Sequence, residues 1–262
     1  MVLLEAILLG IIQGLTEFIP ISSSGHLLIA QYFLNGGGER LFLEFVNIGT
    51  MLALFIFFRK KIWQILLDVF KNKNYRLARN ILLTSLPAGL VGFFAADFIG
   101  TTAFFASAVT VVFTLSIVGV LMILVEKLPK ASPVADGEKL SGVRAFVIGL
   151  AQMIALIPGV SRSGATILAG RFSGLSPAAA AEYSFLASLP IMMGVTVKIL
   201  FTDFDYVTAN LMVVLVSNIF AFAAGLLAVG FLMRYLAKHS LAVFGWYRLV
   251  LAAVLATILL LQ

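Results

Sequence analysis

The stretch "GIIQGLTEFIPISSSG", residues 10–25, decides the fold because a proline and three serines interrupt an apolar segment there. The surrounding segment, residues 1–34, is otherwise apolar. Neither half of it is long enough to cross a hydrocarbon core of roughly 30 Å as a helix that rises about 1.5 Å per residue. Broken backbone at membrane depth is tolerated only where protein or a water-filled cavity satisfies its polar groups. The stretch therefore predicts a re-entrant helix–loop–helix, with one kinked span as the alternative.

A second stretch, "GLAQMIALIPGVSRSG" at residues 149–164, matches the first. At an offset of 139 the identical pairs are Gly10 and Gly149, Gln13 and Gln152, Ser22 and Ser161, Ser24 and Ser163, and Gly25 and Gly164. Each copy precedes three apolar segments. Three crossings after a re-entrant pair reach the opposite membrane face, so the second copy enters from the other side. We therefore predict an inverted-topology repeat whose two broken tips meet near the midplane.

The composition indicates a membrane protein. The chain has 262 residues, of which 61% are hydrophobic and 11% charged, with a mean hydropathy of +1.10. In soluble proteins about a quarter of all residues are charged. The absence of cysteine excludes disulfides and thiolate metal sites. The net charge of +6 does not indicate nucleic acid, because the basic residues crowd into short loops between apolar segments, as membrane orientation requires.

We predict an all-α integral membrane protein with about six transmembrane helices plus two re-entrant segments, 1–34 and 143–175. The expected spans lie near 41–58, 81–99, 104–125, 182–201, 207–232 and 241–262. The single membrane domain, 1–262, divides into a first repeat, 1–125, a cytoplasmic linker, 126–142, and a second repeat, 143–262. The basic stretch 59–80 is expected in the cytoplasm, and the acidic link around Asp203 and Asp205 outside.

Each tip ends in Ser-x-Ser-Gly before a helix restarts. Serine is a favoured N-cap, and glycine lets another group approach the backbone. A helix N-terminus carries free N–H donors and partial positive charge, which attract anions and phosphate above all. Two such termini that face each other predict a phosphate cradle. The alternative is that the serines only cap helices.

The charged residues of the tips differ between the copies. Glu17, Ser23 and His26 belong to the first copy, while Arg162 stands in the second, where the first has Ser23. Ionisable groups at membrane depth are functional candidates. Arg162 beside Ser161, Ser163 and Thr166 is typical of a phosphate clamp. A structural ion pair with Glu17 is its alternative, and His26 is a candidate acid, nucleophile, metal ligand or structural residue.

Other intramembrane charges are less informative. Glu44 begins the first full span of the first repeat, and Glu182 begins the first full span of the second. For each residue two alternatives are open: it belongs to the site, or it lies at the membrane interface. Arg171 and Lys198 are expected to extend to the membrane surface.

Two motifs resemble the signatures of the undecaprenyl-diphosphate phosphatase family, also called the bacitracin-resistance protein family. They are "QGLTEFIPISSSGH" at 13–26 and "PGVSRSGAT" at 158–166, and "AEYSFLASLP" at 181–190 is similar to the family's stretch after the second motif. The resemblance covers nearly the whole chain. It implies an integral membrane hydrolase that removes the terminal phosphate of undecaprenyl diphosphate, which recycles the carrier lipid for cell-wall synthesis and confers bacitracin resistance.

The resemblance also implies roles for residues at matching positions. Glu17, His26 and Arg162 match catalytic residues, and Ser23 matches a proposed nucleophile. Gln13 takes a position where other members have Glu, which puts in doubt a metal scheme that needs two carboxylates in the first motif. The expected substrate-binding residues are Gln13, Ser22, Ser24, Gly25, Ser161, Ser163, Gly164 and Thr166.

The resemblance further implies a divalent cation, Mg²⁺ or Ca²⁺, with Glu17 as a ligand. The substrate would be a lipid diphosphate within the bilayer of a bacterial plasma membrane, and the site would open to the outer face. A homodimer is a possible state of assembly that the resemblance does not decide. Inverted repeats and broken helices are also transporter traits, so a carrier for an anion, or a flippase for the phosphorylated lipid, is the competing hypothesis. A structural scaffold does not explain charges such as Glu17 and Arg162.

Overall fold

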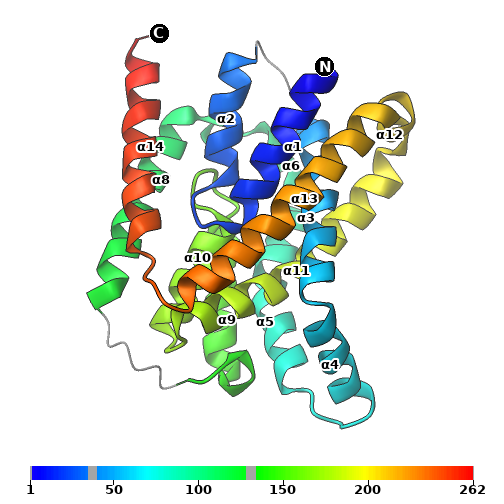
Figure 1. Ribbon diagram of the computed structural model, residues 1–262, viewed down its shortest axis with the longest axis vertical. Helices are drawn as coiled ribbons and strands as arrows, with labels where there is room; N and C mark the ends of the chain where they lie inside the picture. Colours follow the sequence, from blue (N-terminus) through cyan, green and yellow to red (C-terminus); the bar gives the residue numbers. More distant parts are fainter. Residues whose placement is uncertain (1, 35–39, 128–133, 262) are drawn as a thin grey trace.

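The protein is predominantly helical in the part of the chain that the structure describes. The structure is a computed structural model that describes residues 2–34, 40–127 and 134–261 (Figure 1). Apart from one isolated bridge between Val134 and Leu175, its elements in these ranges are helices, which confirms the predicted fold class. The helices are α1 Leu3–Phe18, α2 Ser23–Phe33, α3 Arg40–Phe57, α4 Arg59–Phe70, α5 Arg76–Phe94, α6 Ala96–Thr101, α7 Ala103–Ala106, α8 Ala108–Leu124, η1 Val125–Lys127, η2 Gly137–Lys139, α9 Gly142–Ile154, α10 Arg162–Phe172, α11 Pro177–Thr202, α12 Phe204–Ala209, α13 Leu211–Leu236 and α14 Ala242–Leu260.

Several of these helices have the length and composition of membrane spans. Within the described ranges, α5, α8, α11, α13 and α14 each qualify, and α3 with α4 forms a sixth candidate that is bent by 70°. The protein is therefore a multi-pass membrane protein. The helices follow the expected spans with shifted ends. α5 covers Arg76–Phe94 where a span near 81–99 was expected, and α8 begins at Ala108, where Ser107 caps it, rather than near residue 104. Residues 59–70 of the basic stretch form the helix α4.

Both predicted breaks in the apolar segments are present. α1 ends before Pro20 and α2 runs back toward the end where the chain starts (Figure 1). Proline has no backbone N–H and cannot continue a helix ladder, so it favours a break at this point. The residues that cap the returning helices share an unusual backbone. Ser22 has φ 73° and Ser161 has φ 69°, in the left-handed region. The matched sequences thus fold into matched turns.

Each re-entrant segment lies against a helix from the other half of the chain. α1 contacts α13, and α9 contacts α5. A Cβ at Gly14 would lie 2.5 Å from the carbonyl oxygen of Ala221, and a Cβ at Gly149 would lie 2.8 Å from that of Thr84. Small residues that allow this approach are typical of helix contacts in membranes. The crossed arrangement supports the inverted repeat, while its boundaries at 125 and 143 stay a prediction.

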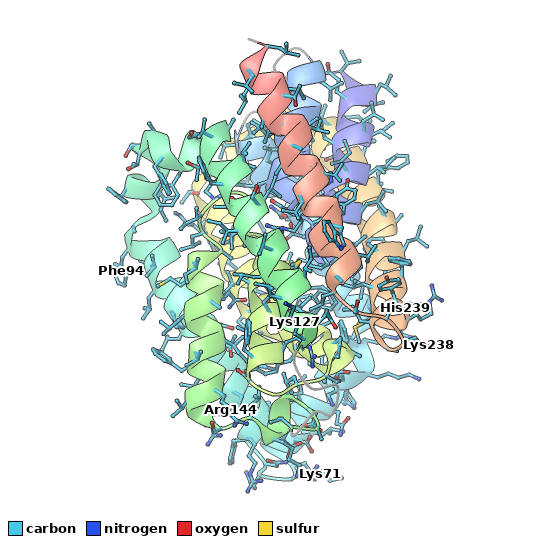
Figure 2. The ribbon with its side chains drawn as sticks, turned by 90° about the vertical axis from the view of Figure 1, so that its left-hand side faces the viewer. Lys71, Phe94, Lys127, Arg144, Lys238 and His239 are labelled. Carbon is cyan, nitrogen blue, oxygen red and sulfur yellow. The ribbon has the colours of Figure 1, made fainter. Side chains whose placement is uncertain are left out.

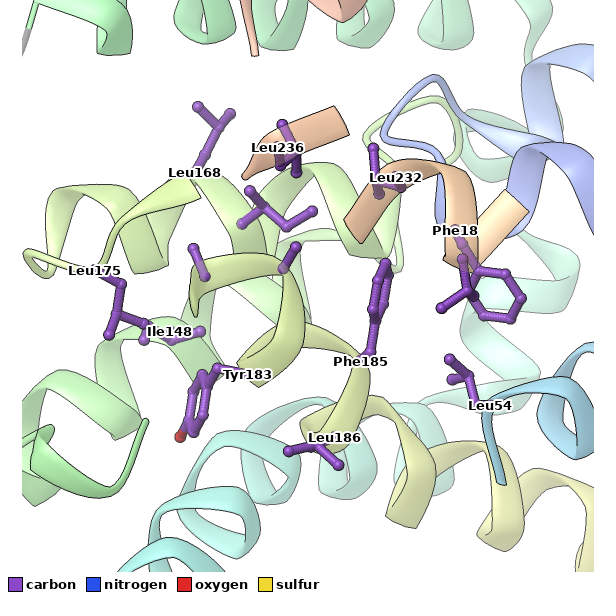
Figure 3. Close-up of a cluster of buried hydrophobic side chains, with 14 of the residues drawn as sticks. Phe18, Leu54, Ile148, Leu168, Leu175, Tyr183, Phe185, Leu186, Leu232 and Leu236 are labelled. Atoms are coloured by element: carbon purple, nitrogen blue, oxygen red, sulfur yellow. The ribbon is translucent and has the colours of Figure 1, made fainter. Parts of the chain in front are cut away.

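A buried hydrophobic cluster holds the end of α1. Phe18 is fully buried and its ring meets Phe185 of α11 edge-on, with 5.6 Å between centroids (Figure 3). Leu54 of α3 and Leu232 of α13 belong to the same cluster. Because Phe18 directly follows Glu17, this cluster fixes where the Glu17 side chain starts.

The two ends of the molecule differ in charge. α1 and α14 bring the two termini to one end, while Lys71, Lys127, Arg144 and Lys238 lie in the other half (Figures 1 and 2). This separation is what the positive-inside rule requires. That the basic end is cytoplasmic stays a prediction, and residues 128–133 of the expected linker lie outside the described residues.

Candidate active site

The two broken tips meet. The backbone N–H of Gly159 in the second tip donates to Ser24 Oγ in the first at 3.2 Å. Ser163 Oγ at the start of α10 donates to the carbonyl oxygen of Glu17 at 3.4 Å. The structure therefore places the N-termini of α2 and α10 at one location, as the repeat predicts.

Glu17 is the centre of this location. Its Oε1 accepts from Arg162 Nη2 at 2.7 Å, and its Oε2 accepts from Ser23 Oγ at 2.8 Å and from Gln13 Nε2 at 3.0 Å. The side chains of Arg162 and Glu17 are only 17% and 14% exposed. The ion pair that was the alternative interpretation of Arg162 is therefore formed, and it joins the two halves of the chain.

Asn47 of α3 extends the polar group. Gln13 Nε2 also donates to Asn47 Oδ1 at 2.5 Å, and Asn47 Nδ2 donates to the carbonyl oxygen of Leu43 at 3.0 Å. Since both Asn47 donor and acceptor atoms are engaged, the amide orientation is fixed. The Gln13 side chain is therefore held between the carboxylate of Glu17 and α3.

Several predicted substrate-binding residues make their hydrogen bonds inside the tips. Ser22 Oγ accepts from the N–H of Gly25 at 3.3 Å, and Ser161 Oγ accepts from the N–H of Gly164 at 3.2 Å. Thr166 is buried and its hydroxyl contacts Ser184. These residues order the helix starts, as caps do. N–H groups of the first helical turn have no helical partner and suit an anion.

His26 faces α14. Its Nδ1 lies 2.8 Å from the carbonyl oxygen of Ser22, and its Nε2 lies 2.7 Å from the hydroxyl of Tyr247. A carbonyl only accepts, so in the neutral ring Nδ1 carries the hydrogen and Nε2 accepts from Tyr247. The rings of His26 and Tyr247 are also nearly parallel, with 5.6 Å between centroids. The structure thus holds His26 at both nitrogens.

Arg248, next along α14, was missed by the sequence analysis. It is fully buried, and its guanidinium donates to the carbonyl oxygens of Leu115, Pro20, Gly159 and Val160 at 3.4, 3.3, 2.5 and 3.1 Å. Pro20 belongs to the first tip and Gly159 to the second. One arginine inside the otherwise apolar span 241–262 was the signal that could have found it.

A cavity of about 420 Å³ opens beside Glu17. Polar side chains form one part of its lining: Gln13, Glu17, Ser23, Ser24, Glu44 and Asn47. Leu27, Leu28, Leu43, Phe105, Val111 and Pro158 form the apolar part. Such a lining suits a molecule with a polar head and an apolar chain.

Glu44 and Glu182, whose roles the sequence did not decide, lie at different locations in the structure. Glu44 lines the cavity beside Glu17. Glu182 instead pairs with Lys61 at 3.5 Å and lines a separate, smaller cavity of about 190 Å³.

The oxygen-rich lining fits a hard divalent cation. Among the described residues, no three His, Asp or Glu side chains come together as a complete metal cluster. Mg²⁺ is commonly held by one or two carboxylates together with substrate phosphates. Glu17 and Glu44 supply two carboxylates in one cavity, so the residues present fit such a cation once a phosphate substrate completes its shell.

The expectation for Arg171 is wrong. Only 5% of the residue is exposed, and its Nη1 donates to the carbonyl oxygen of Leu175 at 2.7 Å. The turn after α10 captures the side chain before it reaches the surface. Lys198 is exposed, and its extension to the membrane surface stays a prediction.

Comparisons with known proteins agree with this picture. The profile of the family described as bacitracin resistance protein BacA matches residues 6–254. A protein of Rubrobacter xylanophilus named undecaprenyl-diphosphatase is 39% identical over an alignment of 273 positions, which covers 99% of each chain. One of Acinetobacter baumannii with the same name is 36% identical over 257 residues, which cover 96% of this chain and 94% of the relative. A third, undecaprenyl-diphosphatase 2 of Shewanella oneidensis, is 37% identical over 263 residues, or 97% of each chain.

Proposed function

This chain belongs to the bacitracin resistance protein BacA family, and from that premise we propose that it is an undecaprenyl-diphosphate phosphatase. The reaction hydrolyses undecaprenyl diphosphate to undecaprenyl phosphate and inorganic phosphate. The product is the carrier lipid of cell-wall synthesis, and its recycling confers resistance to bacitracin.

One observation carries the proposal. One oxygen of the Glu17 carboxylate accepts a hydrogen bond from the Ser23 hydroxyl, and the other accepts one from the Arg162 guanidinium. Both bonds lie where the N-termini of α2 and α10 meet. A hydroxyl within hydrogen-bond reach of a base is the arrangement of an activated nucleophile. A guanidinium and free N–H groups are the donors that phosphoryl transfer requires.

The residues then have the following roles. Ser23 Oγ attacks the terminal phosphorus and passes its proton to Glu17, while the bond from phosphorus to the bridging oxygen breaks and undecaprenyl phosphate leaves. Water then hydrolyses the phosphoserine and releases inorganic phosphate. Arg162 uses one of its five N–H groups on Glu17, so others remain for phosphate oxygens.

The same carboxylates suit the cation that the family resemblance implies. Glu17 and Glu44 would hold Mg²⁺ or Ca²⁺ together with the diphosphate oxygens. When bound, the cation supplies positive charge that offsets the charge of the diphosphate. Asn47 and Gln13 orient the Glu17 carboxylate through their hydrogen bonds.

The cavity supports a substrate that stays in the lipid. Its apolar lining suits the isoprenoid chain, while Glu17 and Ser23 meet the diphosphate. We place the protein in the bacterial plasma membrane with this cavity open to the outer face. The support is that α1, α2 and α14 reach the end opposite Lys71 (Figures 1 and 2).

Purified protein in detergent tests the function directly. Incubation with undecaprenyl diphosphate and Mg²⁺ should release one inorganic phosphate per lipid, and the control Glu17→Gln should release phosphate far more slowly. Transport needs two compartments and hydrolysis does not, so activity in detergent separates the two hypotheses. Absence of phosphate release from folded protein would overturn the assignment. The relatives described above bear the names of hydrolases, and no observation favours the transporter.

A further inference from the structure

We propose that Tyr247 and Arg248, neighbours on α14, are positioning residues of the active site. Arg248 holds the two tips in register, and Tyr247 holds the His26 ring. The inference rests on the proposed phosphatase function. Neither residue was among those predicted from the motifs, and neither lies in them.

The surroundings of Arg248 support a role beyond packing. All of its hydrogen bonds go to backbone carbonyls, and within the described residues no carboxylate forms an ion pair with it. A fully buried cation without a counter-charge is costly. A fixed positive charge near a site strengthens the binding of a multiply charged anion there. This stabilisation of the anion is a functional reason to keep a buried arginine.

The bonds of Arg248 also set the direction of peptide groups. The C=O and N–H of a trans peptide point in opposite directions. When Arg248 holds the carbonyl of Val160, it turns the N–H of Ser161 away from α14. Ser161 directly precedes Arg162, so the start of α10 takes its orientation from Arg248. The bond to Pro20 fixes the first tip in the same way.

Tyr247 contacts α2 beside the first tip. Its hydroxyl meets His26 Nε2 at 2.7 Å, and the Ser22 carbonyl meets Nδ1. The ring of His26 therefore has one orientation and one neutral tautomer. His26 follows Ser23 and Ser24 within the first turns of α2, so its placement also affects the serines.

The pair has no counterpart in the first half of the chain. α8 contacts α14 and follows the first tip as α14 follows the second, yet it has no charged residue and no tyrosine between Ala108 and Leu124. Glu17, His26 and Arg162 are also unmatched between the repeats. Residues that break the repeat thus gather at one place, and Tyr247 and Arg248 belong with them.

Kinetics of three purified variants test the proposal: Arg248→Lys, Arg248→Met and Tyr247→Phe. Lysine keeps the charge but not the planar set of donors, and phenylalanine keeps the ring and loses only the hydroxyl. We expect kcat per folded molecule to fall about 10²-fold for Arg248→Lys, since small misplacements of reacting groups have such effects. For Tyr247→Phe we expect about tenfold, the effect of one lost hydrogen bond. KM should change little.

Matched controls separate positioning from packing. Arg171→Lys alters another buried arginine that bonds a carbonyl, and Tyr235→Phe alters another tyrosine that is stacked on a histidine, His239. Both should keep kcat, whatever their effect on thermal unfolding.

The outcomes are distinct. If the wild type hydrolyses the lipid but Arg248→Lys and Tyr247→Phe keep kcat within about twofold, or change only KM, the inference fails and the function stands. If the wild type releases no phosphate, the proposed function itself fails. Should one Arg248 variant not fold, the other and Tyr247→Phe decide, because Tyr247→Phe removes a single oxygen.

Discussion

Glu17 accepts hydrogen bonds from three side chains that come from different places in the sequence. Gln13 lies one helical turn earlier, Ser23 begins the next helix, and Arg162 belongs to the second half of the chain. Each donor offers a different chemistry to one carboxylate: an amide, a hydroxyl and a permanent positive charge. Substitutions at this residue and its partners should therefore have separable effects.

Arg162→Lys should lower kcat by roughly 10²–10³-fold, as loss of one strong donor to a developing oxyanion does. Lysine keeps the charge but loses the planar fork that grips two phosphate oxygens. Initial rates of phosphate release from the lipid diphosphate measure the effect. Arg144→Lys, an exposed arginine of α9, is the control and should match the wild type. Near-normal hydrolysis by Arg162→Lys would contradict a role in phosphate binding, and the arginine would then serve only in the ion pair with Glu17.

Glu17→Gln should lower activity at least as far, because an amide neither takes a proton nor holds a cation well. A titration of the variant with Mg²⁺ then separates the two roles. Partial recovery at high metal concentration indicates a ligand, since a weakened site fills by mass action. A rate that stays flat indicates a base. Wild-type activity of this variant at any metal concentration would exclude both roles.

The residues at the centre of the site were predictable because they break the repeat. Glu17 and Arg162 each face an unlike residue in the other copy, and the structure brings them together. Arg248 was not predictable from that comparison. It lies in the last span, outside the matched stretches, and nothing in the sequence shows that its partners would be backbone carbonyls of both tips.

At the scale of helices, the contact of α1 with α13 positions the residues of the site that α1 contributes. A Cβ at Gly14 would lie 2.5 Å from the Ala221 carbonyl oxygen and 2.7 Å from the Ala224 Cβ. Gly14 directly follows Gln13 and lies on the helix that carries Glu17. The separation of the two helices therefore sets the position of both side chains.

Gly14→Val should destabilise the protein by about 1–3 kcal/mol, the usual cost of overpacking a close contact. It should also lower activity, since α1 must move away from α13. Thermal unfolding in detergent and phosphate release report the two effects. Gly89→Ala in α5 is the control, because nothing lies within 4 Å of the added Cβ. An unchanged unfolding temperature for Gly14→Val would mean that α1 does not depend on this contact.

The meeting of the tips can be tested with paired cysteines. Ser24 and Pro158 both line the cavity, and Ser24 is bonded to the residue after Pro158. The pair Ser24→Cys and Pro158→Cys should react with a short cross-linker in native membranes, and diphosphate lipid should slow the reaction. Ser24→Cys with Asn72→Cys is the negative control. Equal yields from both pairs would contradict a shared site.

The helices were predictable to different degrees. Proline together with serine and glycine predicted both breaks, because neither half of each interrupted segment is long enough to span the membrane. Proline alone does not break these helices, since Pro87 lies inside α5 and Pro190 inside α11. α4 was missed because its start is dense in charge, Arg59 to Lys61, although Trp63, Leu66, Leu67 and Phe70 recur at helical spacing. The crossing of α1 with α13 depends on which glycines meet which carbonyls, and a single sequence does not contain that information.

On the scale of the whole molecule, the two ends should face different compartments. We expect Asn72→Cys to resist an impermeant thiol reagent added to intact cells, and Asp205→Cys to react with it. The basic stretch beside Asn72 motivates the first expectation, and the acidic link around Asp205 the second. The wild-type chain has no cysteine, so it is the blank. The reverse pattern of labelling would invert the proposed orientation.

The ion pair between Glu17 and Arg162 has a consequence for biosynthesis. The two residues are 145 positions apart, and a ribosome that adds about 5–20 residues per second needs on the order of ten seconds to cover that distance. During this time Glu17 lacks its cation, and α13, which receives α1, is translated later still. A lone carboxylate is costly at membrane depth. The helix pair α1 and α2 is therefore expected to reach its final place only after α10 and α13 have been translated.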